Sequence, residues 1–212
     1  MDGKTAKDSA SLASQAQLHK KMLQLLSSLW VTRAVGAFAR LGLADVMAKG
    51  VADHAAIAAV QEAAFRDHPF SQHEEAQIVA RLREHGALAL SLVATAAGSV
   101  ELIGHIAFSP VRVAGQACGW FGLGPVAVLP ALQRRGIGSA LIETGLARLR
   151  ESGAAGCVLL GDPAYYRRFG FAQQPGLLLP GVPASHFLAL RLEAARPWPA
   201  GTVSYDAAFD PS

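Results

Sequence analysis

The chain has 212 residues, of which 51% are hydrophobic and 17% are charged, and its formal net charge is +3. This composition excludes a disordered protein and predicts a folded chain with one good core and room for an added segment. The small positive charge suits an anionic ligand, but without a Lys/Arg-rich run it argues against a nucleic-acid-binding protein. Cys118 and Cys157 are the two cysteines and lack C-x-x-C spacing, so we expect a reducing, cytoplasmic compartment and no metal site.

The N-terminal fifty residues differ from the rest. Residues 1–16 are polar and are expected to form a disordered lead without a secretory signal, whereas residues 17–50 have the apolar spacing of an amphipathic helical extension. The apolar run at 23–31 is too short to cross a membrane, so no membrane partner is expected. Residues 25–46 resemble the dimerisation helices of small-molecule O-methyltransferases, which implies a homodimer arm; a generic helical hairpin is the alternative. No glycine-rich S-adenosylmethionine site follows, so we expect no methyltransferase activity.

Two helices are predicted next. Asp53 can cap a helix that carries Ile57 on its apolar face. Ser71 and Glu74 have the spacing of a capping box, which opens a second helix that Gly86 ends.

Strand patterns follow the two helices. Residues 87–95 and 100–108 are typical of an antiparallel pair, and Ser109-Pro110 is expected to end their pairing. A turn at 114–116 then leads into an apolar strand over 120–128.

That strand and the loop after it carry the strongest functional signal. Pro125 cannot donate to a sheet ladder, so the strand should be bulged or splayed there, with free backbone groups. The loop then places two arginines and two glycines, within residues 133–138, at the start of a helix. A helix start exposes unpaired N–H groups and a partial positive charge, and the glycines leave room for a ligand. Together these features predict a compact site for a phosphate or pyrophosphate.

Helices and strands alternate in the part of the chain after the glycines. The helix after the glycines should end at Gly153, and residues 156–160 form a short apolar run that is typical of a central strand. A short helix is predicted over 164–169, and late strands are predicted near 171–174 and 187–192.

Three glycine-rich patterns compete for the phosphate site. A P-loop needs Lys-Ser/Thr after its last glycine, but Ser139-Ala140 follows Gly138. A dinucleotide fingerprint fails because Leu141 stands at its last glycine. The pattern Q/R-x-x-G-x-G/A fits residues 133–138 throughout, and it is the pyrophosphate signature of the GNAT superfamily of N-acetyltransferases. The chain resembles the YhbS-like branch of that superfamily, to which residues 123–130 and 161–171 are also similar.

The resemblance covers residues 51–209 and implies an α+β fold. We expect a GNAT acyltransferase domain over 51–212, with a three-layer α/β/α arrangement and a mixed, mostly antiparallel central sheet. The superfamily fold opens with a short strand before its first helix. Because residues 43–50 have a helical pattern here, we predict that this first strand is missing or replaced.

The resemblance also implies acetyl-CoA, or another acyl-CoA, as donor and an amine as acceptor, with direct transfer through a tetrahedral intermediate. Arginines and amides of the loop would hold the pyrophosphate, and backbone groups of the splayed strand would pair with the pantetheine arm. One strand amide could also stabilise the oxyanion. The expected cofactor-binding residues are Val126, Ala127, Val128, Gln133, Arg134, Arg135, Gly136, Ile137, Gly138 and Ser139.

A tyrosine is the expected catalytic residue. Tyr166 lies four residues before Gly170, the place of the superfamily's catalytic tyrosine, and a phenol can protonate the leaving thiolate. Tyr165 is its rival, one position away, and both tyrosines could instead be packing aromatics.

The general base stays open between His105 and Glu75, although a lone histidine in a strand is more often a core residue. Asp162 is either an acceptor-side carboxylate or a helix cap. The alternative function is a catalytically silent CoA-binding or interaction protein with a truncated acyltransferase domain, which a missing first strand would favour.

Overall fold

The computed structural model describes residues 45–48, 54–66, 74–96 and 99–210, all within one compact unit, Gly42–Ser212. This part of the chain contains an eight-stranded sheet with the main path β1-β2-β3-β4-β5-β7. Along this path the β4–β5 pair is parallel and the other pairs are antiparallel. Off this path, β8 pairs with β3 and with the short β6. The strands are β1 (Asp45–Ala48), β2 (Leu90–Thr95), β3 (Leu102–Val113), β4 (Gln116–Val128), β5 (Gly156–Leu160), β6 (Leu177–Leu178), β7 (Phe187–Arg191) and β8 (Gly201–Ser204).

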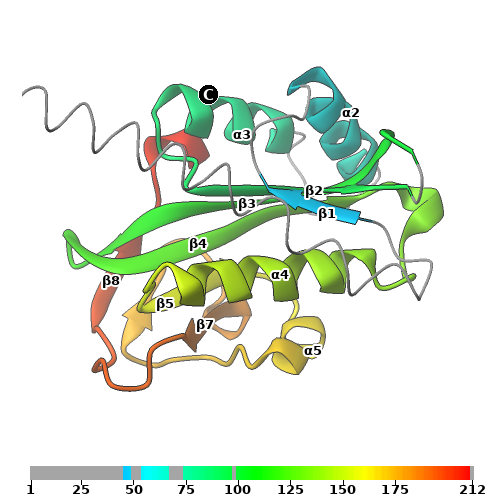
Figure 1. Cartoon of the computed structure of the whole chain (residues 1–212). Helices are drawn as coiled ribbons and strands as arrows, with labels where there is room; N and C mark the ends of the chain where they lie inside the picture. The colour runs from blue at the N-terminus through cyan, green and yellow to red at the C-terminus, as the bar shows by residue number, and fades with distance from the viewer. Residues whose placement is uncertain (1–44, 49–53, 67–73, 97–98, 211–212) are drawn as a thin grey trace, which may run out of the picture. The chain divides into compact units, whose positions relative to one another are not determined.

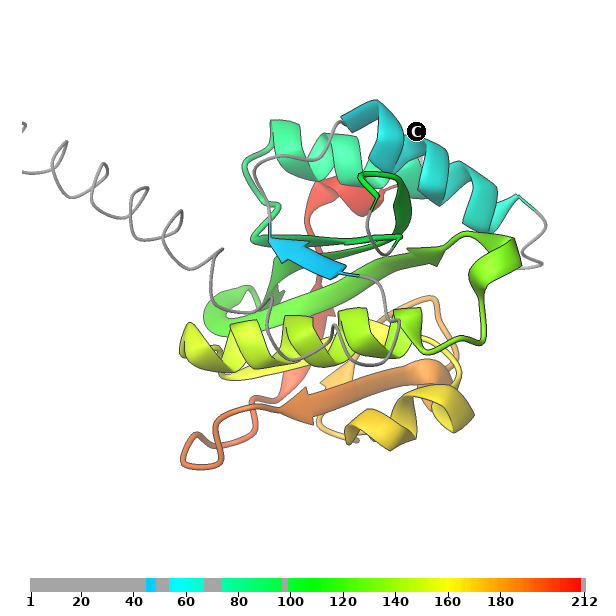
Figure 2. The ribbon, with the colours of Figure 1, turned by 45° about the vertical axis from the view of Figure 1, so that its right-hand side comes forward.

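Helices cover both faces of the sheet (Figure 1, Figure 2). The pair α2 (His54–Phe65) and α3 (Glu75–Glu84) packs on one face, and the long α4 (Ile137–Glu151) packs on the other with the short α5 (Pro163–Tyr166). This arrangement confirms the expected three-layer α+β fold with a mixed, mostly antiparallel sheet.

The helix predicted over residues 43–50 is wrong for Asp45–Ala48, which form β1. This strand pairs antiparallel with β2, from Asp45 opposite Thr95 to Ala48 opposite Leu92. The first strand of the fold is therefore present. Four residues are too few for periodicity to separate a helix from a strand, and pairing along the open edge of β2 decides the outcome.

Several predicted features lie outside the described residues. They include the lead at 1–16, the helical extension at 17–44 with its proposed dimer arm, and the caps assigned to Asp53 and Ser71. The capping-box spacing predicted that Glu74 lies inside the first turn of the second helix. Helix α3 begins instead at Glu75, and Glu74 is its N-cap residue.

The predicted end of the pairing between residues 87–95 and 100–108 at Ser109-Pro110 is confirmed, because β2 pairs with β3 only as far as Phe108. The proline does not end β3 itself. Strand β3 continues beyond it, and Pro110 lies opposite Phe121 of β4. The other edge of β3 pairs with β2 as far as Phe108 and with β8 from Arg112 onward. Pro110 falls between these two stretches, where its missing N–H removes no ladder bond. The turn predicted at 114–116 is confirmed at Ala114 and Gly115, which have positive φ angles of 48° and 75°, whereas Gln116 already belongs to β4.

The C-terminal part differs most from its prediction. The strand predicted over 171–174 is reduced to one bridge, Ala172 with Ala189, and neither β6 nor β8 was predicted. After β8 the chain is tied to the end of α3, because His85 Nδ1 donates to Asp206 at 2.6 Å. The hydrogen bond from His85 holds the pKa of Asp206 below its usual range.

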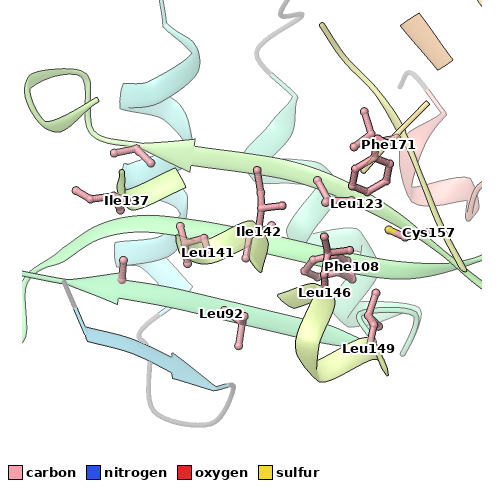
Figure 3. Close-up of a cluster of buried hydrophobic side chains, with 14 of the residues drawn as sticks. Leu92, Phe108, Leu123, Ile137, Leu141, Ile142, Leu146, Leu149, Cys157 and Phe171 are labelled. Carbon is pink, nitrogen blue, oxygen red and sulfur yellow. The ribbon is translucent and has the colours of Figure 1, made fainter. Parts of the chain in front are cut away.

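The main core lies between the sheet and α4 (Figure 3). The apolar face of α4 supplies one side, through residues at steps of three and four. The core residues that are at most 2% exposed include Leu92, Phe108, Leu141, Ile142, Leu146, Cys157 and Phe171.

One glycine of α4 is required by this core. A Cβ on Gly145 would lie 2.4 Å from the ring of Phe108, which is fully buried. We expect Gly145→Ala to lower the free energy of unfolding by about 1–3 kcal/mol through overpacking, despite the better helix propensity of alanine. Gly138→Ala in the same helix is the matched control, since its Cβ would meet its nearest atom only at 3.4 Å. Urea denaturation of both variants measures the difference; equal stability would contradict the packing argument.

Candidate active site

Strands β4 and β5 separate to form a wedge. They pair only from Trp120 opposite Gly156 to Gly122 opposite Val158. Beyond Gly122, β4 keeps β3 as its partner, and β5 keeps β7. The β3–β4 register shifts around Gly124-Pro125, where the peptide bond is cis. The splay predicted from Pro125 is confirmed, and no described strand pairs with the second edge of the last part of β4, which we call the free edge.

Backbone groups of the predicted strand residues face this free edge. The N–H of Leu129 donates to the carbonyl of Ile103 in the direction of β3, at 3.0 Å. Because backbone groups alternate along a strand, those of Val128 and Val126 point away from β3. Those of Ala127, which lies between them, point to β3, so Ala127 can contribute only its small side chain. An extended ligand arm in the wedge could therefore hydrogen-bond with Val126 and Val128.

The loop after β4 has an unusual backbone and leads directly into α4. Arg134 and Gly136 both have left-handed backbones, with φ angles of 61° and 86°. Gly136 is the N-cap of α4, and the N–H of Ala140 makes the first helical bond, to the carbonyl of Gly136 at 2.9 Å. No described residue accepts a hydrogen bond from the amides of residues 134–139. Successive unpaired amides at a helix start form a concave, positively polarised site.

The side chains of this loop divide into two kinds. Arg134 and Arg135 are exposed, and neither is paired with a carboxylate of the described chain. Gln133 instead donates through Nε2 to the carbonyl of Val128 at 3.2 Å, which fastens the loop to the end of β4. Ile137 is only 8% exposed and its side chain belongs to the main core, so only its amide is available to a ligand. Ser139 is half-buried in the first turn of α4.

Tyr166 lies beneath the turn that follows β5. A Cβ on Gly161 would lie 2.4 Å from its ring, so glycine is required for this close approach. Its ring also makes an edge contact with Phe171, at 6.1 Å between centroids. Burial raises the pKa of Tyr166 above its usual range, which keeps the phenol protonated. Asp162 caps α5 by accepting from the N–H of Ala164 at 2.9 Å, in line with the helix-cap interpretation.

A third tyrosine lies at the closed end of the wedge. The ring of Tyr205 packs on Gly122, where a Cβ would lie within 2.3 Å of it. Gly122 has the same sheet parity as Trp120, whose cluster lies on the face opposite α4. The sequence analysis did not single out Tyr205, because only the long-range pairing of β8 with β3 brings it here.

The two candidates for the general base lie in different surroundings. His105 is 1% exposed beneath α2: Gln61 Nε2 donates to its Nδ1 at 2.7 Å, and its Nε2 donates to Ser91 Oγ at 2.9 Å. It is therefore a hydrogen-bonded core histidine. Glu75 is half-buried and, with Glu62 and Arg66, lines a depression of about 220 Å³ between α2 and α3.

The buried state of His105 predicts a pH dependence of stability. Burial, and to a lesser extent the charge of Arg83, lowers its pKa from 6.5 to about 4. Below pH 6.5 the histidine of the unfolded chain binds a proton that the buried His105 does not. The free energy of unfolding is therefore unaffected by this group above pH 6.5 and decreases as the pH falls towards 4. The pKa difference corresponds to about 3 kcal/mol. Urea denaturation should show a smaller acid loss in His105→Gln than in the wild type; identical losses would contradict the assignment.

Metal and membrane features are not seen in the described part of the chain. Its His, Cys, Asp and Glu side chains form no group of three or more that could hold a metal ion. None of its helices has the length and apolar character needed to cross a bilayer.

Comparisons with known proteins agree with this geometry. The model of the acetyltransferase (GNAT) family matches residues 52–171. The uncharacterized N-acetyltransferase YhbS of Escherichia coli K12 is 46% identical over 102 residues, which are 48% of this chain and 60% of YhbS. The chain thus spans less than two thirds of this curated relative.

Two crystal structures are similar over most of their length. A GNAT family acetyltransferase from Brucella melitensis, in complex with acetyl-CoA, is 47% identical with a TM-score of 0.69, over 80% of this chain and 99% of that chain. YhbS from Escherichia coli, in complex with CoA, is 35% identical with a TM-score of 0.71, over 80% of this chain and 93% of that chain.

These relatives give no support to the O-methyltransferase resemblance of residues 25–46, of which the structure describes two, both in β1. The family match includes the wedge, the glycine loop and both tyrosines of α5. The chain belongs to the GNAT acetyltransferase family.

Proposed function

We propose that this protein is an acetyl-CoA-dependent N-acyltransferase that moves an acetyl group directly to an amine acceptor. The observation that carries the proposal is the wedge between β4 and β5 beside the unengaged amides of residues 134–139. A ligand with a pyrophosphate and an extended amide-rich arm matches this pair of features. The crystal structures of relatives with bound acetyl-CoA or CoA support the same donor class.

In the proposed complex, Arg134, Arg135 and the loop amides bind the pyrophosphate, and the free edge of β4 binds the pantetheine arm. The arm runs from the start of α4 towards Gly122, where the wedge closes. This places the thioester between the two strands and directs its carbonyl oxygen to an amide on β4. Such a donor typically lowers the barrier by about 3–4 kcal/mol when it stabilises an oxyanion.

The reaction then needs no covalent enzyme intermediate. The neutral amine attacks the thioester carbonyl carbon and forms a tetrahedral oxyanion, which collapses by breaking the C–S bond. Tyr166 donates its phenolic proton to the departing thiolate, and the ammonium proton leaves to solvent. A proton from solvent then restores the phenol of Tyr166, so the protons balance over the cycle. Since α4 and α5 occupy the donor face, the amine approaches from the opposite face, which α2, α3 and Tyr205 border.

The test separates binding from turnover. Calorimetric titration of the full chain with acetyl-CoA should show one site, and an amine panel that follows CoA release should then find an acceptor. Binding without release on any amine would support a silent CoA-binding protein. The argument for that alternative from the sequence, a missing first strand, does not hold, because β1 is present.

A further inference from the structure

Tyr165 lies where the two halves of the proposed donor site meet. A Cβ on Gly138 would lie 3.4 Å from the hydroxyl oxygen of Tyr165 and 3.7 Å from Cγ2 of Val128. The hydroxyl therefore lies beside the first turn of α4, and the side chain of Val128, at the end of β4, lies beside the same glycine. Tyr166, one residue later, packs instead beneath Gly161. The two neighbouring tyrosines therefore contact different sides of the wedge, Tyr165 at the start of α4 and Tyr166 at the turn after β5.

The ring of Tyr165 is held firmly. It makes edge contacts with Tyr166, at 5.0 Å and 89° between planes, and with Phe169, at 5.6 Å. The guanidinium of Arg168 lies 4.6 Å from the ring centroid, and its Nε donates to the carbonyl of Tyr165 at 2.9 Å. These contacts fix the ring through its faces and edges, while no described residue is hydrogen-bonded to the hydroxyl. The position of the hydroxyl is set by packing, which makes it pre-organised for a ligand.

The chemistry around the hydroxyl selects the ligand group. The amides at the start of α4, beside the hydroxyl, have no acceptor among the described residues, and Arg168, stacked on the ring, adds positive charge. The exposed Arg134 and Arg135 belong to the loop that precedes this helix start. Several N–H and O–H donors close to one another can share one acceptor if that acceptor has several lone pairs. A negatively charged phosphate oxygen is an acceptor of this kind. The phenol of Tyr165 can donate to the same phosphate oxygen as the amides at the start of α4.

Resting on the proposed function, we propose that Tyr165 is a cofactor-binding residue whose hydroxyl donates to the donor's pyrophosphate. Because Val128, at the end of the edge that binds the pantetheine arm, lies beside the same Gly138, the hydroxyl contacts the phosphate nearer that arm. The 3′-phosphate of CoA and the thioester play no part in this contact. Tyr165 therefore affects donor affinity, whereas Tyr166 affects the chemical step.

The experiment measures dissociation constants of the full chain for CoA, dephospho-CoA and phosphate-free pantetheine by calorimetry or competition. Tyr165→Phe should weaken CoA and dephospho-CoA alike by about tenfold to a hundredfold, the usual effect of a hydrogen bond to a charged group. Pantetheine binding should not change. Arg167→Gln is the control, because Arg167 is exposed on the same turn and carries a charge but no phenol. Circular dichroism and melting temperature verify that both variants fold.

Each outcome decides one question. If the wild type binds CoA and Tyr165→Phe binds it equally well, the role of Tyr165 is wrong and the proposed function stands. A loss for CoA but not for dephospho-CoA would move the hydroxyl to the 3′-phosphate, and an equal loss for pantetheine would exclude a phosphate contact; both overturn the proposal. If the wild type binds none of the three probes, the proposed function itself fails.

Discussion

Gly138→Glu is expected to weaken acetyl-CoA binding by about a hundredfold or more while the fold remains intact. The new carboxylate would stand at the second position of α4, among the unengaged amides, and would occupy the proposed phosphate site itself. Glycine is not needed here by the protein alone, since an added Cβ would make only ordinary contacts at 3.4 and 3.7 Å. A glutamate in the first turn of a helix is also favoured by the helix dipole. Titration with acetyl-CoA measures the loss.

Two substitutions at the same position separate charge from size. Gly138→Gln has the length of glutamate without its charge, so we expect an intermediate loss of affinity. Gly138→Ala adds only the Cβ and should bind acetyl-CoA within about threefold of the wild type. Unchanged affinity in Gly138→Glu, with an unchanged melting temperature, would mean that the donor phosphates bind elsewhere.

The features that could be predicted from the sequence depend on local chemistry. Pro125 lacks the N–H that a ladder bond needs, and the β3–β4 register shifts around this residue, so an irregularity of β4 could be predicted from its presence. The glycines at 136 and 138 and the helix start after them act within one turn of chain. The position of the proposed anion site therefore follows from residues that are neighbours in the sequence.

The features that could not be predicted depend on long-range pairing. Strand β1 exists because residues 45–48 meet the edge of β2, some forty residues later in the chain. Pro110 does not end β3 because two different strands occupy the same edge on either side of it. Tyr205 reaches Gly122 only through the pairing of β8 with β3. None of these contacts leaves a pattern in the neighbouring residues.

The two tyrosines of α5 show where sequence spacing is insufficient. Spacing from Gly170 selects Tyr166 for the chemical step, but it assigns no role to Tyr165. Only the packing separates them, because Gly161 receives one ring and Gly138 lies beside the hydroxyl of the other. Their positions differ by one residue on a short helix, so the side chains diverge by about 100°.

Tyr166→Phe is expected to lower kcat by about a hundredfold, with the KM for the amine within about twofold of the wild type. The leaving thiolate would lose its proton donor, whereas binding of neither substrate requires the hydroxyl. Phenylalanine preserves the contacts with Gly161 and Phe171, so the fold should not change. Because burial raises the pKa of Tyr166, the wild-type phenol remains protonated in alkaline solution. Its kcat should therefore show no alkaline decline up to about pH 10 from this group.

Tyr165→Phe is the matched control, since it removes a hydroxyl from the neighbouring residue and is expected to change donor affinity and not kcat. Single-turnover measurements at saturating acetyl-CoA isolate the chemical step from product release. If Tyr166→Phe retains wild-type turnover there and Tyr165→Phe does not, the proton donor is Tyr165, and its hydroxyl must reach the thioester. If both variants retain it, the thiolate is protonated by water, and the phenol of Tyr166 serves only to fill the space beneath Gly161.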